Sequence, residues 1–176
     1  MIDDILQRLE QQKLVDWGVI LQGWKDIPGC NLRIRSEYIE NFAFQKVEKY
    51  EGDILDIVIE LTSIKFLDSA KILILLEEMC NEEKIDLEIS MKKWRLAMLE
   101  EILDNLSNDC LYDLIELSDF WISWGTPSDK PHLIQRLDSK LNPTEYYSEK
   151  NYQKTLEAHK IWIEQEKYKI HQSRDR

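Results

Sequence analysis

The sequence predicts an all-α fold: a single-domain multi-helix bundle with a long C-terminal helix, or alternatively an irregular α-solenoid of connected helix pairs. The chain has only 5 Gly and 4 Pro in 176 residues, which is typical of a protein with few tight turns. Apolar residues recur at intervals of three and four along most of the chain, as on the buried face of a helix. A chain of this length is most simply one domain, residues 1–176.

The first 50 residues are expected to hold two helices joined by turns. Residues 3–15 form the first helix. Trp17-Gly18 and Gly23-Trp24 predict turns around a compact tryptophan–glycine element, and the Asp-Ile-Pro-Gly run at 26–29 predicts a tight turn. Ser36 is expected to cap a second helix that extends to residue 50.

Residues 54–61 fit two patterns. Ile57, Ile59 and Leu61 alternate as in a strand, whereas Ile54, Ile57, Val58 and Leu61 recur as on a helix. We favour the helix because the segments on both sides are helical. Gly52 would then end the preceding helix and Asp53 would cap this one.

Three further helices are expected before residue 124. Asp68 is a cap for the helix 70–80, and the most regular apolar stripe covers residues 86–106. The run Ser107-Asn108-Asp109 predicts a break and a new cap before the helix 110–123. The apolar side of this last helix is expected to consist of Leu111, Leu114, Ile115, Leu117, Trp121 and Ile122.

The C-terminal segment is expected to contain a short helix and a long one. Gly125 followed by Pro127 is a stop signal. Pro131 is expected to open a short helix through Leu141, and Asn142-Pro143 predicts a turn. The final amphipathic helix is expected to begin at residue 144 or 148 and to end near residue 171.

The negative charge of the chain lies almost entirely in its middle. Residues 51–119 contain 18 of the 34 acidic residues but only 6 of the 23 basic ones, whereas the flanking segments are nearly neutral. A field of one sign steers molecules of opposite charge. The block therefore favours a basic protein partner, and it opposes direct binding of nucleic acid.

The acidic residues of this block cluster at helical spacing, where like charges destabilise a helix by about 0.2–0.5 kcal/mol per pair. Three interpretations remain open: a solvated face that aids solubility, a docking face for a basic partner, or carboxylates that hold Mg²⁺ or Mn²⁺ in a helical enzyme. A scaffold or regulatory protein would use the same docking face. The candidate partner-binding residues are Asp53, Asp56, Glu60, Glu100, Glu101, Asp104, Asp113 and Glu116.

Sequence motifs for catalysis are absent. The chain has no Gly-rich phosphate loop, no HExxH zinc motif, no GxSxG elbow and no EF-hand loop. None of His132, His159 and His171 has a Glu three residues before it, as a di-iron bundle would require. We therefore expect a protein that is not an enzyme and that holds no cofactor or metal.

The chain is expected to be cytoplasmic. It begins Met-Ile-Asp-Asp, which lacks the basic start of a signal peptide. It has no run of about 18 apolar residues that would span a membrane. Cys30, Cys80 and Cys110 form no CxxC pair and are expected to be buried free thiols in a reducing compartment.

The aromatic residues are expected to pack in the core, above all Trp94 and Trp121 on their apolar stripes. Trp17, Trp24 and Trp124 border glycines in predicted turns, where an exposed tryptophan would be an interface anchor. His159, three residues before a tryptophan, is expected to be a packed and hydrogen-bonded histidine.

Four short patterns carry a family resemblance. They are Trp17-Gly18 with Gly23-Trp24, Lys93-Trp94-Arg95, Trp124-Gly125-Thr126-Pro127 and His159-x-x-Trp162-Ile163-x-x-Glu166. Together they resemble a family of small bacterial cytosolic proteins known as a domain of unknown function. The resemblance implies no catalytic residues. It implies instead a likeness to immunity proteins encoded beside polymorphic or contact-dependent toxins, which would block a basic toxin domain, such as a nuclease, by occlusion.

Overall fold

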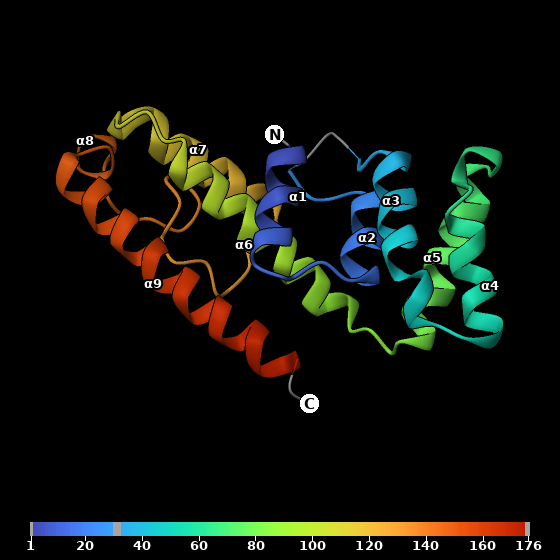
Figure 1. Cartoon of the computed structure of the whole chain (residues 1–176). Coiled ribbons are helices and arrows are strands. Elements are labelled where there is room, and N and C mark those ends of the chain that lie inside the picture. The colour runs from blue at the N-terminus through green and yellow to red at the C-terminus, as the bar shows by residue number, and fades with distance from the viewer. Residues whose placement is uncertain (1, 30–32, 175–176) are drawn as a thin grey trace. The chain divides into compact units, whose positions relative to one another are not determined.

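The computed structural model describes residues 2–29 and 33–174, and it confirms the all-α class (Figure 1). Within these residues the regular structure is helical, apart from one isolated bridge between Gln135 and Ser139. The α-helices are α1 (Ile2–Gln11), α2 (Trp17–Trp24), α3 (Ser36–Lys46), α4 (Gly52–Leu61), α5 (Ser69–Glu82), α6 (Leu87–Asp104), α7 (Cys110–Ser123), α8 (Pro143–Tyr146) and α9 (Glu149–Arg174). Two 3-10 helices, η1 (Val47–Lys49) and η2 (Ile64–Phe66), flank α4.

The chain forms two compact units, Met1–Trp94 and Arg95–Arg176, which are called unit 1 and unit 2 below. The boundary falls inside α6, between Trp94 and Arg95. Each unit has its own buried residues. A single domain over residues 1–176 stays a prediction.

Helix α2 of unit 1 covers Trp17, Gly18 and Gly23, which were expected to form turns. That expectation is wrong, because Asp16 caps a helix here by accepting a hydrogen bond from the amide of Val19 (2.9 Å). The second oxygen of Asp16 binds the ammonium group of Lys93. Most of α2 is buried, and it packs along α5.

Both glycines of α2 allow close approach of neighbouring side chains. A Cβ atom at Gly23 would lie 2.7 Å from Cγ2 of Ile34 and 2.8 Å from the Trp94 ring. That ring is fully buried, and its N–H donates to the carbonyl oxygen of Val19 (2.9 Å). Glycine is therefore needed at this position for packing.

Helices α3, α4 and α5 pack in sequence on one another in unit 1 (Figure 1). The helix predicted for residues 54–61 is confirmed. The cap at Asp68 is also confirmed, because its carboxylate accepts from the amide of Lys71 (2.7 Å). Two other caps were wrong: Arg35 precedes α3 in place of Ser36, and Glu51 precedes α4 in place of Asp53, neither with a side-chain hydrogen bond.

Helix α7 has the predicted bounds but buries a different face. Its Asp109 cap is confirmed by hydrogen bonds from the amides of Leu111 (2.9 Å) and Tyr112 (3.2 Å). Leu111, Ile115 and Ile122 were expected in the core, yet they are 42%, 40% and 51% exposed. The buried face consists of Asp113, Leu114, Leu117, Ser118, Phe120 and Trp121.

The short helix expected from Pro131 to Leu141 is wrong. This segment is an ordered loop in which the carbonyl oxygen of Ile134 accepts from the amides of residues 137, 138 and 139. Arg136 has a φ of 65°, which a right-handed helix cannot accommodate. Asn142 is the N-cap of α8, in a capping box with Glu145, rather than part of a simple turn. The long C-terminal helix is confirmed as α9.

The described cysteines are free thiols. Cys80 is buried, and burial raises the pKa of its thiol to about 12. Cys110 is only half-buried, so the expectation of burial was wrong for it, and Cys30 lies outside the described residues.

Within the described part of the chain, no helix combines the length and apolar character needed to cross a membrane.

Replacing Gly23 by Ala should lower the free energy of unfolding by about 1–3 kcal/mol, the usual cost of overpacking a core. The added methyl group would collide with Ile34 and the fixed Trp94 ring. Urea denaturation checks this. Gln22→Ala, at a half-buried position of the same helix, is the control and should change the value by less than about 0.5 kcal/mol. Equal values for the two variants would contradict the packing role of Gly23.

Candidate functional site

The eight predicted partner-binding acids lie in three settings. Asp53, Asp56 and Glu60 are exposed on α4 in unit 1. In unit 2, Asp104 and Glu116 are exposed and Glu101 is half-buried. Glu100 and Asp113 are buried. The structure thus brings the acids of α4 together on one face and takes two others out of contact with solvent.

The acidic face of α4 is defined by Asp53, Asp56 and Glu60. At about 100° per residue these positions fall within about 60° of one another around the helix axis, while Val58 and Leu61 point into the core. Glu60 pairs with Lys71 of α5 (3.2 Å). Among the residues that the structure describes, Asp53 and Asp56 have no hydrogen-bond or ion-pair partner.

Apolar side chains are also exposed on α4, on η2 and on α5. Ile59, next to Glu60, is 48% exposed, Phe66 in η2 is 79% exposed and Ile74 in α5 is 49% exposed. Their helices α4 and α5 pack on each other. Exposed apolar groups on the same surface as charged groups are typical of a region that binds another protein.

Asp113 is a structural residue, contrary to its prediction as a partner contact. It is 1% exposed and accepts hydrogen bonds from the amide (3.0 Å) and hydroxyl (2.7 Å) of Ser107 and from the hydroxyl of Tyr152 (2.6 Å). Burial raises the pKa of the Asp113 carboxyl, but these hydrogen bonds outweigh it and lower the pKa overall. The carboxylate ties α7 to α9 and to the loop before α7.

Glu100 is likewise directed to the interior of unit 2. Its side chain is 10% exposed, and its carboxylate binds the ammonium group of Lys167 in α9 (2.8 Å). The carboxylate pairing raises the pKa of Lys167 despite the opposing effect of burial. Glu100 therefore joins α6 to α9 and does not present its charge to a partner.

Unit 2 contains a buried cation that sequence reasoning did not single out. Arg95 is 8% exposed and its guanidinium binds Asp129 (2.8 Å) and Glu166 (3.4 Å). The same group lies over the rings of Trp162 (5.0 Å to the centroid) and Trp121 (5.7 Å). In the sequence, this cluster was signalled only by two of the patterns that carry the family resemblance, Lys93-Trp94-Arg95 and His159-x-x-Trp162-Ile163-x-x-Glu166.

Two histidines in unit 2 are held in the neutral state. Nε2 of His159 accepts from the indole N–H of Trp121 (2.9 Å), so its Nδ1 carries the proton and donates to the carbonyl oxygen of Thr155 (2.7 Å). Burial lowers the pKa of His159 to about 4. Burial, with the nearby His159 and Lys130, lowers the pKa of His132 to about 3. The prediction of a packed His159 is confirmed.

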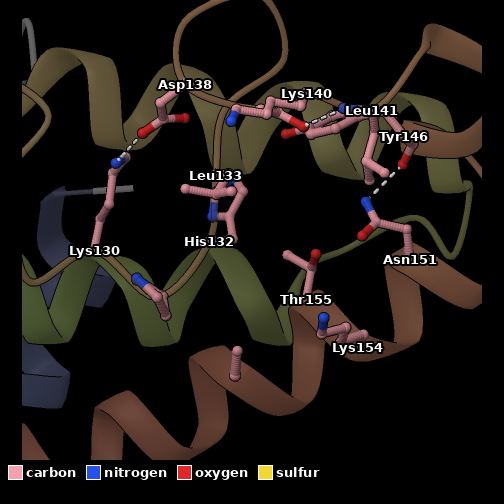
Figure 2. Close-up of a pocket in the computed structure, with 13 residues that line it drawn as sticks. Lys130, His132, Leu133, Asp138, Lys140, Leu141, Tyr146, Asn151, Lys154 and Thr155 are labelled. Carbon is pink, nitrogen blue, oxygen red and sulfur yellow. Dashed lines mark hydrogen bonds and ion pairs between the residues drawn. The ribbon is translucent and has the colours of Figure 1, made fainter.

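A pocket of about 460 Å³ opens between the loop 130–141 and α9 in unit 2 (Figure 2). Asn151, Thr155 and Ala158 line it from one face of α9, and Lys154 lies beside them. The opposite wall comes from the loop, with Leu133 and Leu141 exposed to 57% and 42%. Sequence reasoning missed this pocket because it treated the loop as a helix.

Charge in the pocket is predominantly positive. Three lysines line it, and the single acid, Asp138, binds the ammonium group of Lys130. Burial raises the pKa of Asp138, but the hydrogen bonds from Lys130 and the amide of Ile134 lower it overall. Lys140 and Lys154 have no acidic partner among the residues that the structure describes.

Metal-binding geometry is absent from the described residues, where no three His, Cys, Asp or Glu side chains come together in a group that could hold an ion.

Stability should fall as the pH drops below 6.5, because the unfolded chain takes up protons on both histidines before the folded chain does. Each histidine contributes about 1.4 kcal/mol per pH unit between its unfolded and folded pKa values. His132→Leu should therefore make the decrease between pH 6 and 4.5 shallower by about that amount. Urea unfolding across this range measures it, with the exposed His171→Gln as control. Parallel curves for the protein and His132→Leu would contradict the burial of a neutral imidazole.

Replacing Asp113 by Asn should destabilise the fold by about 1–3 kcal/mol, because the amide cannot accept all three hydrogen bonds. Asp53→Asn, with the same chemical change on an exposed surface, should alter the free energy of unfolding by less than about 0.5 kcal/mol. Denaturation of both variants at pH 7 tests the contrast, and an unaffected Asp113→Asn would show that this carboxylate is not structural.

Comparison with known proteins yields a family match. Residues 6–167 match the family model described as "Uncharacterized protein conserved in bacteria (DUF2247)". No curated protein matches the chain, and no solved structure matches it. The likeness to immunity proteins stays a prediction. Because the match covers nearly the whole chain, the protein belongs to this bacterial family.

Proposed function

We propose that this protein binds a basic protein partner through the acidic face of α4 and blocks it, as an immunity protein blocks a toxin domain such as a nuclease. The observation that carries the proposal is the exposure of Asp53 and Asp56, without partners among the described residues, on the same side of α4 as Glu60.

Charge complementarity supports a basic partner. Residues 52–82, which span α4 and α5, hold seven acids and two bases. Carboxylates without internal partners are solvated and available, and their field accelerates encounter with a positive surface. A nuclease cleft shaped for phosphates presents such a surface, and carboxylates placed there would occupy the positions of phosphate oxygens.

Affinity would come from a few apolar anchors rather than from the charges. Ile59 and Phe66 are large and exposed, and their burial against a partner would remove apolar area from water. The proposed activity is stoichiometric occlusion without turnover. Membership of a bacterial family is consistent with a role in competition between bacteria.

The product of the gene adjacent to this one is the first partner to test. Surface plasmon resonance should detect binding, with an association rate that falls as NaCl is raised from 50 to 300 mM. The double variant Asp53→Lys/Asp56→Lys should slow association about tenfold or more at 50 mM NaCl, because the steering field reverses over α4. Cells that express the product of the adjacent gene should grow only when this protein is co-expressed.

A matched control separates local from global charge. Glu37→Lys/Glu157→Lys changes the net charge by the same amount at exposed positions outside α4, and it should slow association much less. An equal effect of both double variants would remove the α4 face from the proposal. A neighbour that neither binds nor inhibits growth would overturn the immunity role.

A further inference from the structure

The pocket of unit 2 is separate from the acidic face of α4, and its chemistry differs from that of the rest of the chain. The protein carries a net charge of −11, yet the lining of this pocket holds three lysines and one acid. Lys130 and Asp138 bind each other, so the net positive charge resides on Lys140 and Lys154. We propose that the pocket binds a small organic anion, a carboxylate attached to an apolar body.

The apolar part of the ligand is indicated by the pocket walls. Leu133 and Leu141 are more than two-fifths exposed at the pocket, although leucines of this size are usually buried. Pro131 and Ala158 add further apolar lining. A cavity of about 460 Å³ lies within the range of small-molecule sites, which are mostly apolar with a few polar groups.

The anionic part is indicated by the two lysines without acidic partners. Lys154 lies on α9 beside Thr155, and Lys140 lies on the loop that forms the opposite wall (Figure 2). A carboxylate between these walls would gain a charge-assisted hydrogen bond from either ammonium group. The Ser139 hydroxyl, which accepts from the amide of Leu141 (3.3 Å), has its own proton left to donate.

The pocket is held open by bonds within its own walls. The Asp138 carboxylate accepts from the amide of Ile134 as well as from Lys130, and this closes the loop on itself. On the other side, the Asn151 amide donates to the carbonyl oxygen of Tyr146 (2.7 Å) and fixes the start of α9 to α8. A binding site formed before the ligand arrives loses less entropy on binding.

The imidazole of His132, which belongs to the loop 130–141, also lines the pocket. It is 9% exposed, and neither of its ring nitrogens has a hydrogen-bond partner among the described residues. Its ring lies 5.0 Å from that of His159. A neutral ring in the pocket lining adds no positive charge, so recognition of the anion rests on the lysines.

Titration of the protein with octanoate tests the proposal. Two related probes test the contributions of the negative charge and of the apolar chain separately. Octanoate has a carboxylate and an apolar chain, octylammonium has the chain with the opposite charge, and inorganic phosphate has the charge without the chain. Octanoate should bind by calorimetry and should shift amide NMR signals of residues 130–141 and 151–158. Octylammonium and phosphate should each bind at least tenfold more weakly. Equal binding of octanoate and octylammonium would overturn the assignment of an anion.

Lys154→Met should weaken octanoate binding about tenfold, the effect of losing one charge-assisted hydrogen bond. Lys150→Met makes the same change one turn earlier on α9, outside the pocket lining, and should leave the affinity within twofold. Both lysines are exposed, so both variants should fold, which circular dichroism would check. Lys140→Met is a second variant on the opposite wall. Unchanged affinity in Lys154→Met and Lys140→Met, or signal shifts outside the pocket only, would overturn the site.

Discussion

The packing of unit 2 depends on the buried guanidinium of Arg95. Such a charge is tolerated in a protein interior only when it is paired and hydrogen-bonded. Asp129 and Glu166 supply the opposite charge, and the faces of Trp121 and Trp162 cover the planar group. These partners come from the loop after α7, from α9 and from α7 itself. One side chain of α6 therefore fixes the positions of three segments that are distant in the sequence.

The fold could be predicted from the sequence wherever the signal was local. The Asp68 and Asp109 caps act on amides two or three residues away, so the sequence contains both partners of each hydrogen bond. Which residues of α7 are buried depends on contacts with residues that are distant in the sequence, and these contacts could not be predicted. Leu111 and Ile115 adjoin the core-facing residues on the helix surface, and Asp113 becomes buried only because Ser107 and Tyr152 satisfy its carboxylate. No periodicity reveals that partnership.

The candidate sites were predicted unequally for the same reason. The acids of α4 share a face by helical spacing alone, which the sequence shows directly. The pocket depends on a loop in which leucines at 133, 137 and 141 imitate helical spacing. A backbone residue with positive φ, at Arg136, and a carboxylate that binds its own loop override this pattern. Residue type does not signal the positive φ, because arginine rarely adopts such a conformation. Residue type also does not show that the Asp138 carboxylate binds an amide of its own loop.

The hydrogen bond between Cys110 and Glu149 (2.8 Å) has a consequence for thiol chemistry. A cysteine in the first turn of a helix is usually activated, because the helix dipole favours the thiolate. Here the Cys110 thiol donates a hydrogen bond to the Glu149 carboxylate, and this interaction raises the pKa of Cys110. The thiol therefore stays protonated at neutral pH and is a poor nucleophile. Despite its partial exposure, Cys110 is therefore less reactive as a nucleophile than its place in the first turn of α7 would suggest.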